Sequence, residues 1–224
     1  MIITIDGPAG AGKSTVAKLL AQRLSGRTPC EYLDTGSMYR AVALAGIRRN
    51  VDWNIPERLE EVANCVSINV WEARTFLDGE DVTERVRSPE VTEKTRFSAN
   101  NPAIREIMVR LQQQIGKRYL LENKSLVTEG RDQGTIVFPD ADFKFFITAT
   151  PEERARRRFG EMRRRGESGD LNEILQAINL RDAQDSSRKV GPLREPDDAH
   201  RVVTDGMEID EVVRYLIRII EKNN

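Results

Sequence analysis

A glycine-rich segment near the start of the chain constrains the fold more than any other feature. Residues 7–15 read GPAGAGKST and match the pattern GxxxxGK[ST]. An apolar stretch over residues 2–6, predicted to be a strand, precedes this segment. Apolar residues at helical spacing follow it over residues 13–24. The pattern therefore occurs between a strand and a helix, which is the context that a phosphate-binding loop requires.

The chemistry of this loop predicts ATP or a close relative as a ligand. Backbone N–H groups and the positive helix N-terminus can surround a β-phosphate, and glycines allow the close approach. Lys13 would neutralise charge between the β- and γ-phosphates, and the Ser14 hydroxyl would bind Mg²⁺. The predicted phosphate-binding residues are Gly7, Pro8, Ala9, Gly10, Ala11, Gly12, Lys13, Ser14 and Thr15.

Apolar periodicity along the rest of the chain predicts an α/β fold, a P-loop NTPase-type parallel sheet flanked by helices. With 224 residues the chain is long enough for one such domain. Further strands are expected over residues 31–34, 125–128, 143–148 and 201–204. Further helices are expected over residues 37–50, from residue 101 onward, and over 150–165, 171–187 and 208–222.

Residues 52–95 depart from this alternating pattern. Residues 66–70 alternate with period two, and residues 75–77 lead into Asp78-Gly79, a hairpin turn signal. Residues 81–83 can return as the partner strand. We therefore expect a small antiparallel, lid-like subdomain inserted in the parallel scheme.

Composition excludes several classes of protein. Thirty-five basic and 36 acidic residues give a net charge of −1, which argues against a whole-surface affinity for nucleic acid or anionic membrane. Cys30, Cys65 and the single His200 provide no metal-ligand spacing. Neither a signal sequence nor an apolar run of membrane-spanning length is found. We expect a cytoplasmic protein, with nothing in the sequence that demands more than a monomer.

Three arginine-bearing segments suggest a second anionic ligand. Residues 33–40 and 130–132 follow predicted strands, at the sheet edge where α/β proteins bind ligands. Arg181, Asp185 and Arg188 fall at i, i+4 and i+7, which predicts one face of one helix. Each segment alone could be a surface charge, a turn or a helix ion pair. Together with the phosphate loop they favour a phosphate acceptor pocket, because arginine binds phosphate through a bidentate fork.

The helix predicted from residue 150 contains seven arginines between residues 154 and 165. We interpret residues 150–169 as a mobile lid that brings cations onto the transferring phosphoryl group. Arg154, Arg157 and Arg158 share a face and are the predicted inward-pointing residues, with Arg163 to Arg165 in solvent. The alternatives are a solvated basic helix and an RNA-binding helix. Phe159 is the only aromatic residue among the arginines, which counts against RNA binding.

The phosphate loop does not name a reaction by itself. A GTPase should carry a guanine-recognition motif of the form Asn-Lys-x-Asp. The nearest match, residues 123–126, reads NKSL and lacks the Asp. A motor-type ATPase would need an apolar strand that ends in an acid. Residues 125–129 come closest to this, so an ATPase remains open beside a small-molecule kinase.

Five motifs together resemble the bacterial cytidylate kinase family over nearly the whole chain. They are GPAGAGKST (7–15), LDTGSMYR (33–40), DGEDV (78–82), GRDQGTIVFPD (130–140) and RDxxDxxR (181–188). The inserted segment is similar to that family's enlarged monophosphate-binding subdomain. The resemblance implies transfer of a phosphoryl group from ATP to CMP or dCMP, with Mg²⁺.

The resemblance also implies roles for individual residues. Arg40, Arg131 and Arg188 would hold the CMP phosphate. Arg181 and Asp185 would contact the ribose, and Arg181 the phosphate as well. Arg105 and Asp132 would read the cytosine edge, which fits because a carboxylate accepts a hydrogen bond from cytosine N4. The residues expected to shape the acceptor pocket are Thr35, Gly36, Tyr39 and Gly130.

For catalysis we expect Lys13, Arg131, Arg154 and Arg158, and for ATP binding Arg157, because positioned cations are the main catalytic device in phosphoryl transfer. One position departs from the family pattern. Arg96, with Ser98 two residues on, stands where some relatives carry a serine that touches the base.

Overall fold

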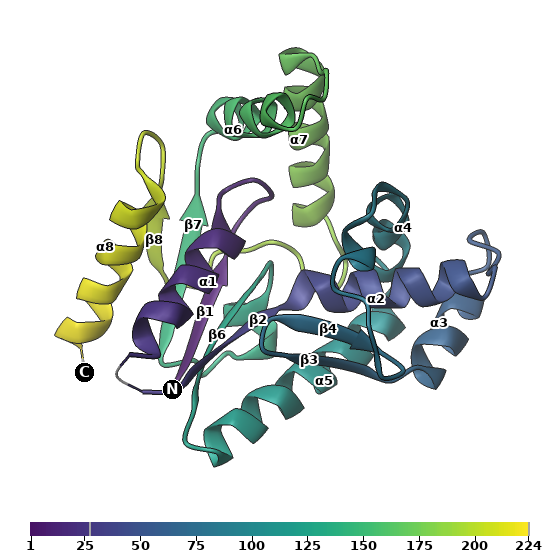
Figure 1. Cartoon of the computed structure of the whole chain (residues 1–224), viewed down its shortest axis with the longest axis horizontal. Helices are drawn as coiled ribbons and strands as arrows, with labels where there is room; N and C mark the ends of the chain where they lie inside the picture. Colours follow the sequence, from purple (N-terminus) through teal and green to yellow (C-terminus); the bar gives the residue numbers. More distant parts are fainter. Residues whose placement is uncertain (27, 224) are drawn as a thin grey trace.

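A computed structural model shows a five-stranded parallel sheet flanked by helices, as the sequence predicts (Figure 1). It describes residues 1–26 and 28–223. The strand order is β2-β6-β1-β7-β8, with β1 in the centre. A separate three-stranded antiparallel sheet has the order β3-β4-β5. The predicted fold class is confirmed.

The strands of the main sheet are β1 (Ile2–Asp6), β2 (Cys30–Asp34), β6 (Ser125–Gly130), β7 (Phe143–Thr148) and β8 (His200–Val203). The small sheet contains β3 (Ile68–Trp71), β4 (Arg74–Leu77) and β5 (Glu80–Asp81). The helices are α1 (Lys13–Leu24), α2 (Thr35–Arg48), α3 (Pro56–Cys65), α4 (Pro89–Ala99), α5 (Pro102–Leu121), α6 (Pro151–Arg164), α7 (Leu171–Ser186) and α8 (Ile209–Lys222). Two short turns are the 3₁₀ turn η1 (Arg85–Arg87) and the π-helical turn η2 (Gln133–Val137).

A hydrophobic core lies on each face of the main sheet. One core joins β1 and β7 to α1 and α8, and it includes the fully buried Ile5 and Phe145. The other joins β6 to α2, α5 and the small sheet, and it includes Met38 and Ile104. The β1 and β6 side chains, which read as apolar runs, are therefore buried from both sides, as is typical of parallel sheets.

Local sequence signals set several helix starts. The side chain of Asn101 accepts from the N–H of Ile104, with Pro102 at the first helical position. Thr150 likewise accepts from the N–H of Glu153, but its own N–H donates to Asp205. Thr150 thus caps α6, and Asp205 rather than a residue of the helix accepts from the backbone N–H of Thr150. Helix α2 begins two residues earlier than expected, because Asp34 caps it through the N–H of Ser37.

The segment predicted as a small antiparallel insertion is more varied than expected. Its hairpin turn is present between β4 and β5, and pairing begins at Glu80. The segment also contains α3 and most of α4, which pack against α2. Helices were missed there because the period-two stretch at residues 66–70 dominates the pattern. The boundaries at residues 52 and 95 remain a prediction.

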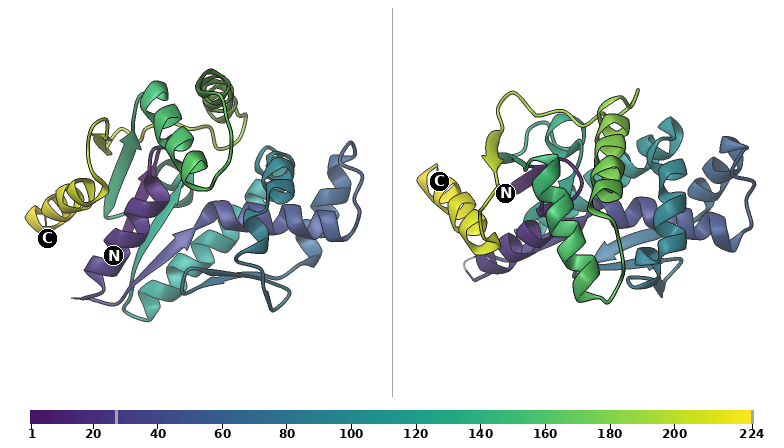
Figure 2. Two further views of the ribbon diagram at one scale, coloured as in Figure 1. Left: turned by 45° about the horizontal axis from the view of Figure 1, so that its top comes forward. Right: turned by 90° about the horizontal axis from the view of Figure 1, so that it is seen from above.

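Helices α6 and α7 pack on each other and lie above the ends of β1 and β7 in Figure 1, where the two helices cross rather than run alongside each other. The views in Figure 2 place this pair on one side and the block of α2, α3 and α4 on the other. No helix in the described ranges, 1–26 and 28–223, is long and apolar enough to cross a bilayer.

Candidate functional site

One large cleft opens along the carboxyl ends of the parallel strands, with a volume of about 970 Å³. Its walls come from the phosphate loop, β2, β6, α4, α6 and α7, and from the loop that follows β8. Register explains why distant segments meet here, because Asp34 at the end of β2 pairs with Glu129 on β6. Glu129 in turn lies beside Ile5 of β1, next to the phosphate loop. The volume is at the upper end for a ligand pocket and leaves room for more than one substrate.

The phosphate loop provides one end of the cleft. Residues 9–16 line it, whereas Gly7 and Pro8 lie behind the lining. Gly7 must be glycine, because its φ is +146° and a Cβ would lie 1.9 Å from the carbonyl oxygen of Ile147. The Nζ of Lys13 donates to the Pro8 carbonyl at 2.8 Å. Burial, helped by the charge of Arg131, lowers the pKa of Lys13 to about 7. A polyanion beside Lys13 would restore its charge.

Three oxygen-bearing side chains meet below the phosphate loop. The Ser14 hydroxyl donates to Oε1 of Glu129 at 2.7 Å. Asp34 lines the same part of the cleft and is 6% exposed, as is Glu129. Hydroxyl and carboxylate oxygens are the ligands that Mg²⁺ prefers. In the described parts of the chain no group of three or more acidic, His or Cys side chains could enclose a metal by itself. These residues therefore fit an ion that keeps waters and phosphate oxygens as its other ligands.

An arginine cluster forms the other end of the cleft, around a single carboxylate. Asp185 is 2% exposed and accepts from Arg131 Nε at 2.8 Å and from Arg188. Burial opposes ionisation of Asp185, but the two guanidinium groups outweigh burial and lower its pKa. Burial and the neighbouring Arg131 lower the pKa of Arg181. Arg40 also lines this end.

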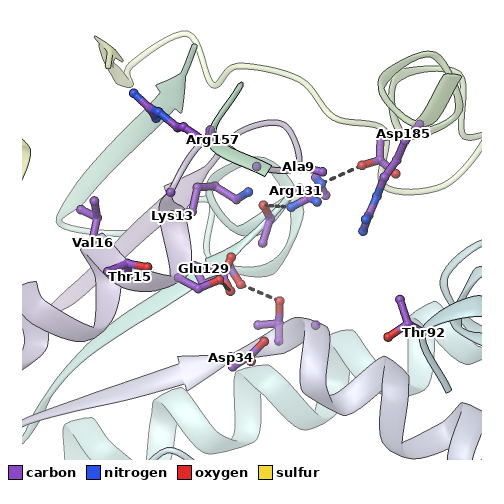
Figure 3. Close-up of a pocket in the computed structure, with 18 of the residues that line it drawn as sticks. Ala9, Lys13, Thr15, Val16, Asp34, Thr92, Glu129, Arg131, Arg157 and Asp185 are labelled. Atoms are coloured by element: carbon purple, nitrogen blue, oxygen red, sulfur yellow. Dashed lines mark hydrogen bonds and ion pairs between the residues drawn. The ribbon is translucent and has the colours of Figure 1, made fainter. Parts of the chain in front are cut away.

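Four arginines and one carboxylate thus line this end of the cleft, and the excess of positive charge suits a phosphate. Figure 3 shows Arg131 between Lys13 and Asp185, so this residue lies between the two ends of the cleft. Helix α7 ends at Ser186, so Arg188 lies beyond it. Of the three residues predicted to share one helix face, Arg181 and Asp185 are the two that lie on the helix. The Nε of Arg188 instead reaches Asn100 Oδ1 at 2.9 Å, across from α4.

A buried ion pair lies beside the arginine cluster. Arg105 donates to Oδ2 of Asp132, and both residues are almost fully buried yet line the cleft. The guanidinium carbon of Arg105 lies 5.4 Å from the centre of the Tyr39 ring. Carboxylate, guanidinium and phenol therefore offer hydrogen-bond donors and acceptors beside an aromatic ring, an environment suited to a nucleobase.

The remaining predicted pocket residues also gather here. Thr35 and Gly36 line the cleft at the start of α2, with Thr35 Oγ1 donating to the carbonyl of Glu129 at 2.7 Å. Arg96 lines the cleft and stacks on Phe97. Ser98 is fully buried and donates to the carbonyls of Tyr39 and Thr95. Ser98 therefore does not line the cleft.

The arginines of α6 differ from the prediction that Arg154, Arg157 and Arg158 point into the cleft. Arg157 does line it and donates to the Thr204 carbonyl at 2.5 Å. Arg154 is 3% exposed and lies behind the wall, bound to Asp182 of α7 and to the Ala9 carbonyl. Arg158 does not line the cleft but pairs with Glu161, with half of its side chain exposed. Packing of α6 on α7 turns the helix so that Arg156 and Arg164 line the cleft in their place.

Several cleft residues were missed by sequence reasoning. Asp34 was not assigned, and Glu129 was considered only as the acid that ends the strand of an ATPase. Each stands near the end of a predicted strand, a signal that could have identified both. Arg87 reaches the cleft from η1 and binds Asp34 at 3.1 Å. Thr92 and Thr95 on α4 line the acceptor end, and no local pattern marks them.

Comparisons with known proteins agree with this geometry. The family model described as "Cytidylate kinase" matches residues 3–222. The chain is 47% identical to a "Cytidylate kinase" of Caldanaerobacter subterraneus subsp. tengcongensis, over 99% of this chain and 95% of the relative. It is 45% identical to a "Cytidylate kinase" of Rhodopirellula baltica, over 99% of this chain and 93% of the relative.

Among solved structures, an uncharacterized protein from Eubacterium ventriosum ATCC 27560 superposes with a TM-score of 0.50. Its sequence is 19% identical, and the match covers 99% of this chain and 98% of that one. At this identity the likeness supports the fold alone.

Proposed function

The chain belongs to the cytidylate kinase family, and from this premise we propose how its cleft carries out the reaction ATP + CMP (or dCMP) ⇌ ADP + CDP (or dCDP). A phosphate oxygen of the acceptor attacks the γ-phosphorus of ATP, and the bond from that phosphorus to the β–γ bridging oxygen breaks. The observation that carries the proposal is one cleft with a phosphate loop at one end and a group of arginines at the other.

ATP would occupy the phosphate-loop end. Backbone N–H groups of residues 9–15 would bind its β- and γ-phosphates, and Lys13 would neutralise them. Arg157, which lines the cleft above the loop, would add a cation from α6. Arg154 supports this end from behind, since it holds the Ala9 carbonyl of the loop and Asp182 of α7 together. Arg158 would have to turn inward to act on the substrates.

The Ser14 hydroxyl would bind Mg²⁺ directly. Glu129 and Asp34 would accept hydrogen bonds from the water molecules bound to the ion. When bound, it supplies charge compensation for the phosphate oxygens. The chain's own contribution there is the fixed hydrogen bond between Ser14 and Glu129, which orients the hydroxyl.

CMP would occupy the arginine end. Arg40, Arg131 and Arg188 would hold its phosphate, and Arg181 and Asp185 its ribose. Arg105 and Asp132 would read the base, with Asp132 accepting from the cytosine amino group. Thr35, Gly36, Tyr39 and Gly130 would complete the pocket walls.

No general base is needed, because the oxygens of the CMP phosphate are already nucleophilic. Catalysis would rest on positioning and on cations that stabilise charge on the equatorial oxygens. Residues 150–169 would act as a lid whose closure excludes water. We propose that a monomer in the cytoplasm carries out the reaction, and the presence of both ends of the cleft in one chain supports the monomer.

An acceptor panel tests the function. A coupled assay of ADP release is run with CMP, dCMP, UMP, AMP, GMP and shikimate. We expect the highest kcat/KM with CMP or dCMP, and a higher value with any other acceptor would refute the cytidylate assignment. An RNA-binding ATPase would instead hydrolyse ATP without an acceptor and bind RNA with steep salt dependence.

A further inference from the structure

Asp6, the last residue of β1, is a buried acid that lies outside the cleft. Its side chain is fully buried, and the phosphate loop begins at the next residue, Gly7. Among residues 1–26 and 28–223, no lysine or arginine forms an ion pair with it within 4.0 Å. Its two oxygens instead accept from the backbone N–H groups of Gln133 at 2.9 Å and Gly134 at 2.7 Å.

These two N–H groups begin the turn η2, immediately after Arg131 and Asp132. A helix start leaves such N–H groups without partners from its own backbone. Asp6 therefore joins the strand that leads into the donor loop to the segment that presents two acceptor residues. The connection runs through a rigid parallel strand on one side and a single turn on the other.

Neighbouring contacts restrict the same segment further. The Gln133 side chain accepts from Thr128 at 2.9 Å and donates to Gln112 at 3.1 Å. A Cβ added to Gly134 would lie 3.0 Å from Thr4 Oγ1, so this residue packs directly on β1. Little freedom remains in the segment as long as the Asp6 carboxylate is present.

Burying a carboxylate costs free energy, so it is an inefficient way to stabilise a fold. Burial raises the pKa of Asp6 to about 7, against the opposing effect of its two N–H donors. Breaking a buried polar contact is destabilising, but an apolar replacement of the whole arrangement is often neutral. The location of this carboxylate therefore indicates a role in holding one geometry.

We propose that Asp6 is a positioning residue, which sets the placement of Arg131 and Asp132 relative to the phosphate loop through the N–H groups of Gln133 and Gly134. It touches neither substrate and acts through those two residues. The proposal deepens the proposed function and rests on it only where CMP phosphorylation is measured.

The test compares Asp6→Asn with Asp142→Asn as a matched control. An asparagine keeps one acceptor oxygen and turns an N–H₂ group toward the second N–H. Asp142 also accepts from a backbone N–H of β1, that of Ile2 at 2.6 Å, but at the other end of the strand. Amide exchange measured by NMR and steady-state kinetics are the two readouts.

For Asp6→Asn we expect faster amide exchange at Gln133 and Gly134, by roughly tenfold or more, with the central β1 amides unchanged. The kcat/KM for CMP should fall by roughly tenfold to a hundredfold, because small displacements of positioning residues are costly. The Kd of ATP should stay within about twofold, and the control should change none of these values.

Unchanged exchange at the two amides would overturn the proposal, whatever the kinetics. An equal loss of ATP affinity would also overturn it, because Asp6 would then act on the phosphate loop. A wild-type protein without CMP turnover would refute the proposed function, and the exchange readout would still decide the placement role. If Asp6→Asn does not fold, Asp6→Ser, which is smaller and keeps one acceptor, is measured with the same expectations.

Discussion

Replacement of Arg131 by alanine tests the two-ended cleft most directly. Arg131 leaves β6 at the boundary between the donor and acceptor ends, and its Nε binds Asp185 at 2.8 Å. The substitution removes a cation that would contact the CMP phosphate before and during transfer. It also leaves Asp185 with Arg188 as its remaining guanidinium partner.

The expected magnitude follows from these contacts. Loss of a preorganised donor to a developing anionic charge lowers the rate by about 10²- to 10³-fold, or roughly 2.7–4 kcal/mol. We therefore expect a fall of that size in kcat/KM for CMP. The loss of one hydrogen bond to a buried carboxylate adds about 1.5–3 kcal/mol of destabilisation to the folded protein.

ATP affinity should respond differently. The charge of Arg131 helps to lower the pKa of Lys13, so its removal makes protonation of Lys13 easier. A charged Lys13 favours the triphosphate. We expect the Kd of ATP to stay within about twofold of the wild-type value, or to fall slightly.

Three measurements test this prediction. ADP release is measured at varied CMP concentration, ATP binding by calorimetry, and the free energy of unfolding by urea titration. Arg58→Ala is the control, since Arg58 is exposed and pairs with its helix neighbour Glu61. Arg131→Lys keeps the positive charge but loses the bidentate guanidinium group, so its rate should lie between those of Arg131→Ala and the wild type. A parallel loss of ATP affinity and CMP turnover in Arg131→Ala would refute the separation of the two ends.

Three further predictions concern the loop, the metal and the buried acid. Gly7→Ala, whose Cβ would meet the Ile147 carbonyl at 1.9 Å, should raise the Kd of ATP in calorimetry by roughly tenfold or more; unchanged binding would contradict the loop geometry. Ser14→Ala should raise the midpoint of Mg²⁺ activation by roughly tenfold at fixed ATP, and an unmoved midpoint would rule Ser14 out as a ligand. The pKa of Asp6 is raised to about 7, so its contribution to folding is largest in acid and declines as the pH rises from about 4 to 7, by up to about 1.4 kcal/mol per unit. Urea unfolding should therefore show the stability of Asp6→Asn improving relative to wild type over that range, and a constant difference would argue against the raised pKa.

Local signals determined much of the fold from the sequence alone. The phosphate loop and the hairpin turn at Asp78-Gly79 depend on residues within a few positions of one another. The strands and helices of the parallel sheet follow from apolar periodicity, which is also a local property. These predictions succeeded because the physics that decides them acts over one or two turns.

Tertiary structure decided which side chains meet. Asp34, Glu129 and Ser14 come together only through the parallel register of β2, β6 and β1. Arg158 shares a helix face with Arg154 in sequence, yet it does not line the cleft, because α7 fixes the rotation of α6 through Asp182. Such contacts depend on the packing of distant segments, which no spacing along the chain encodes.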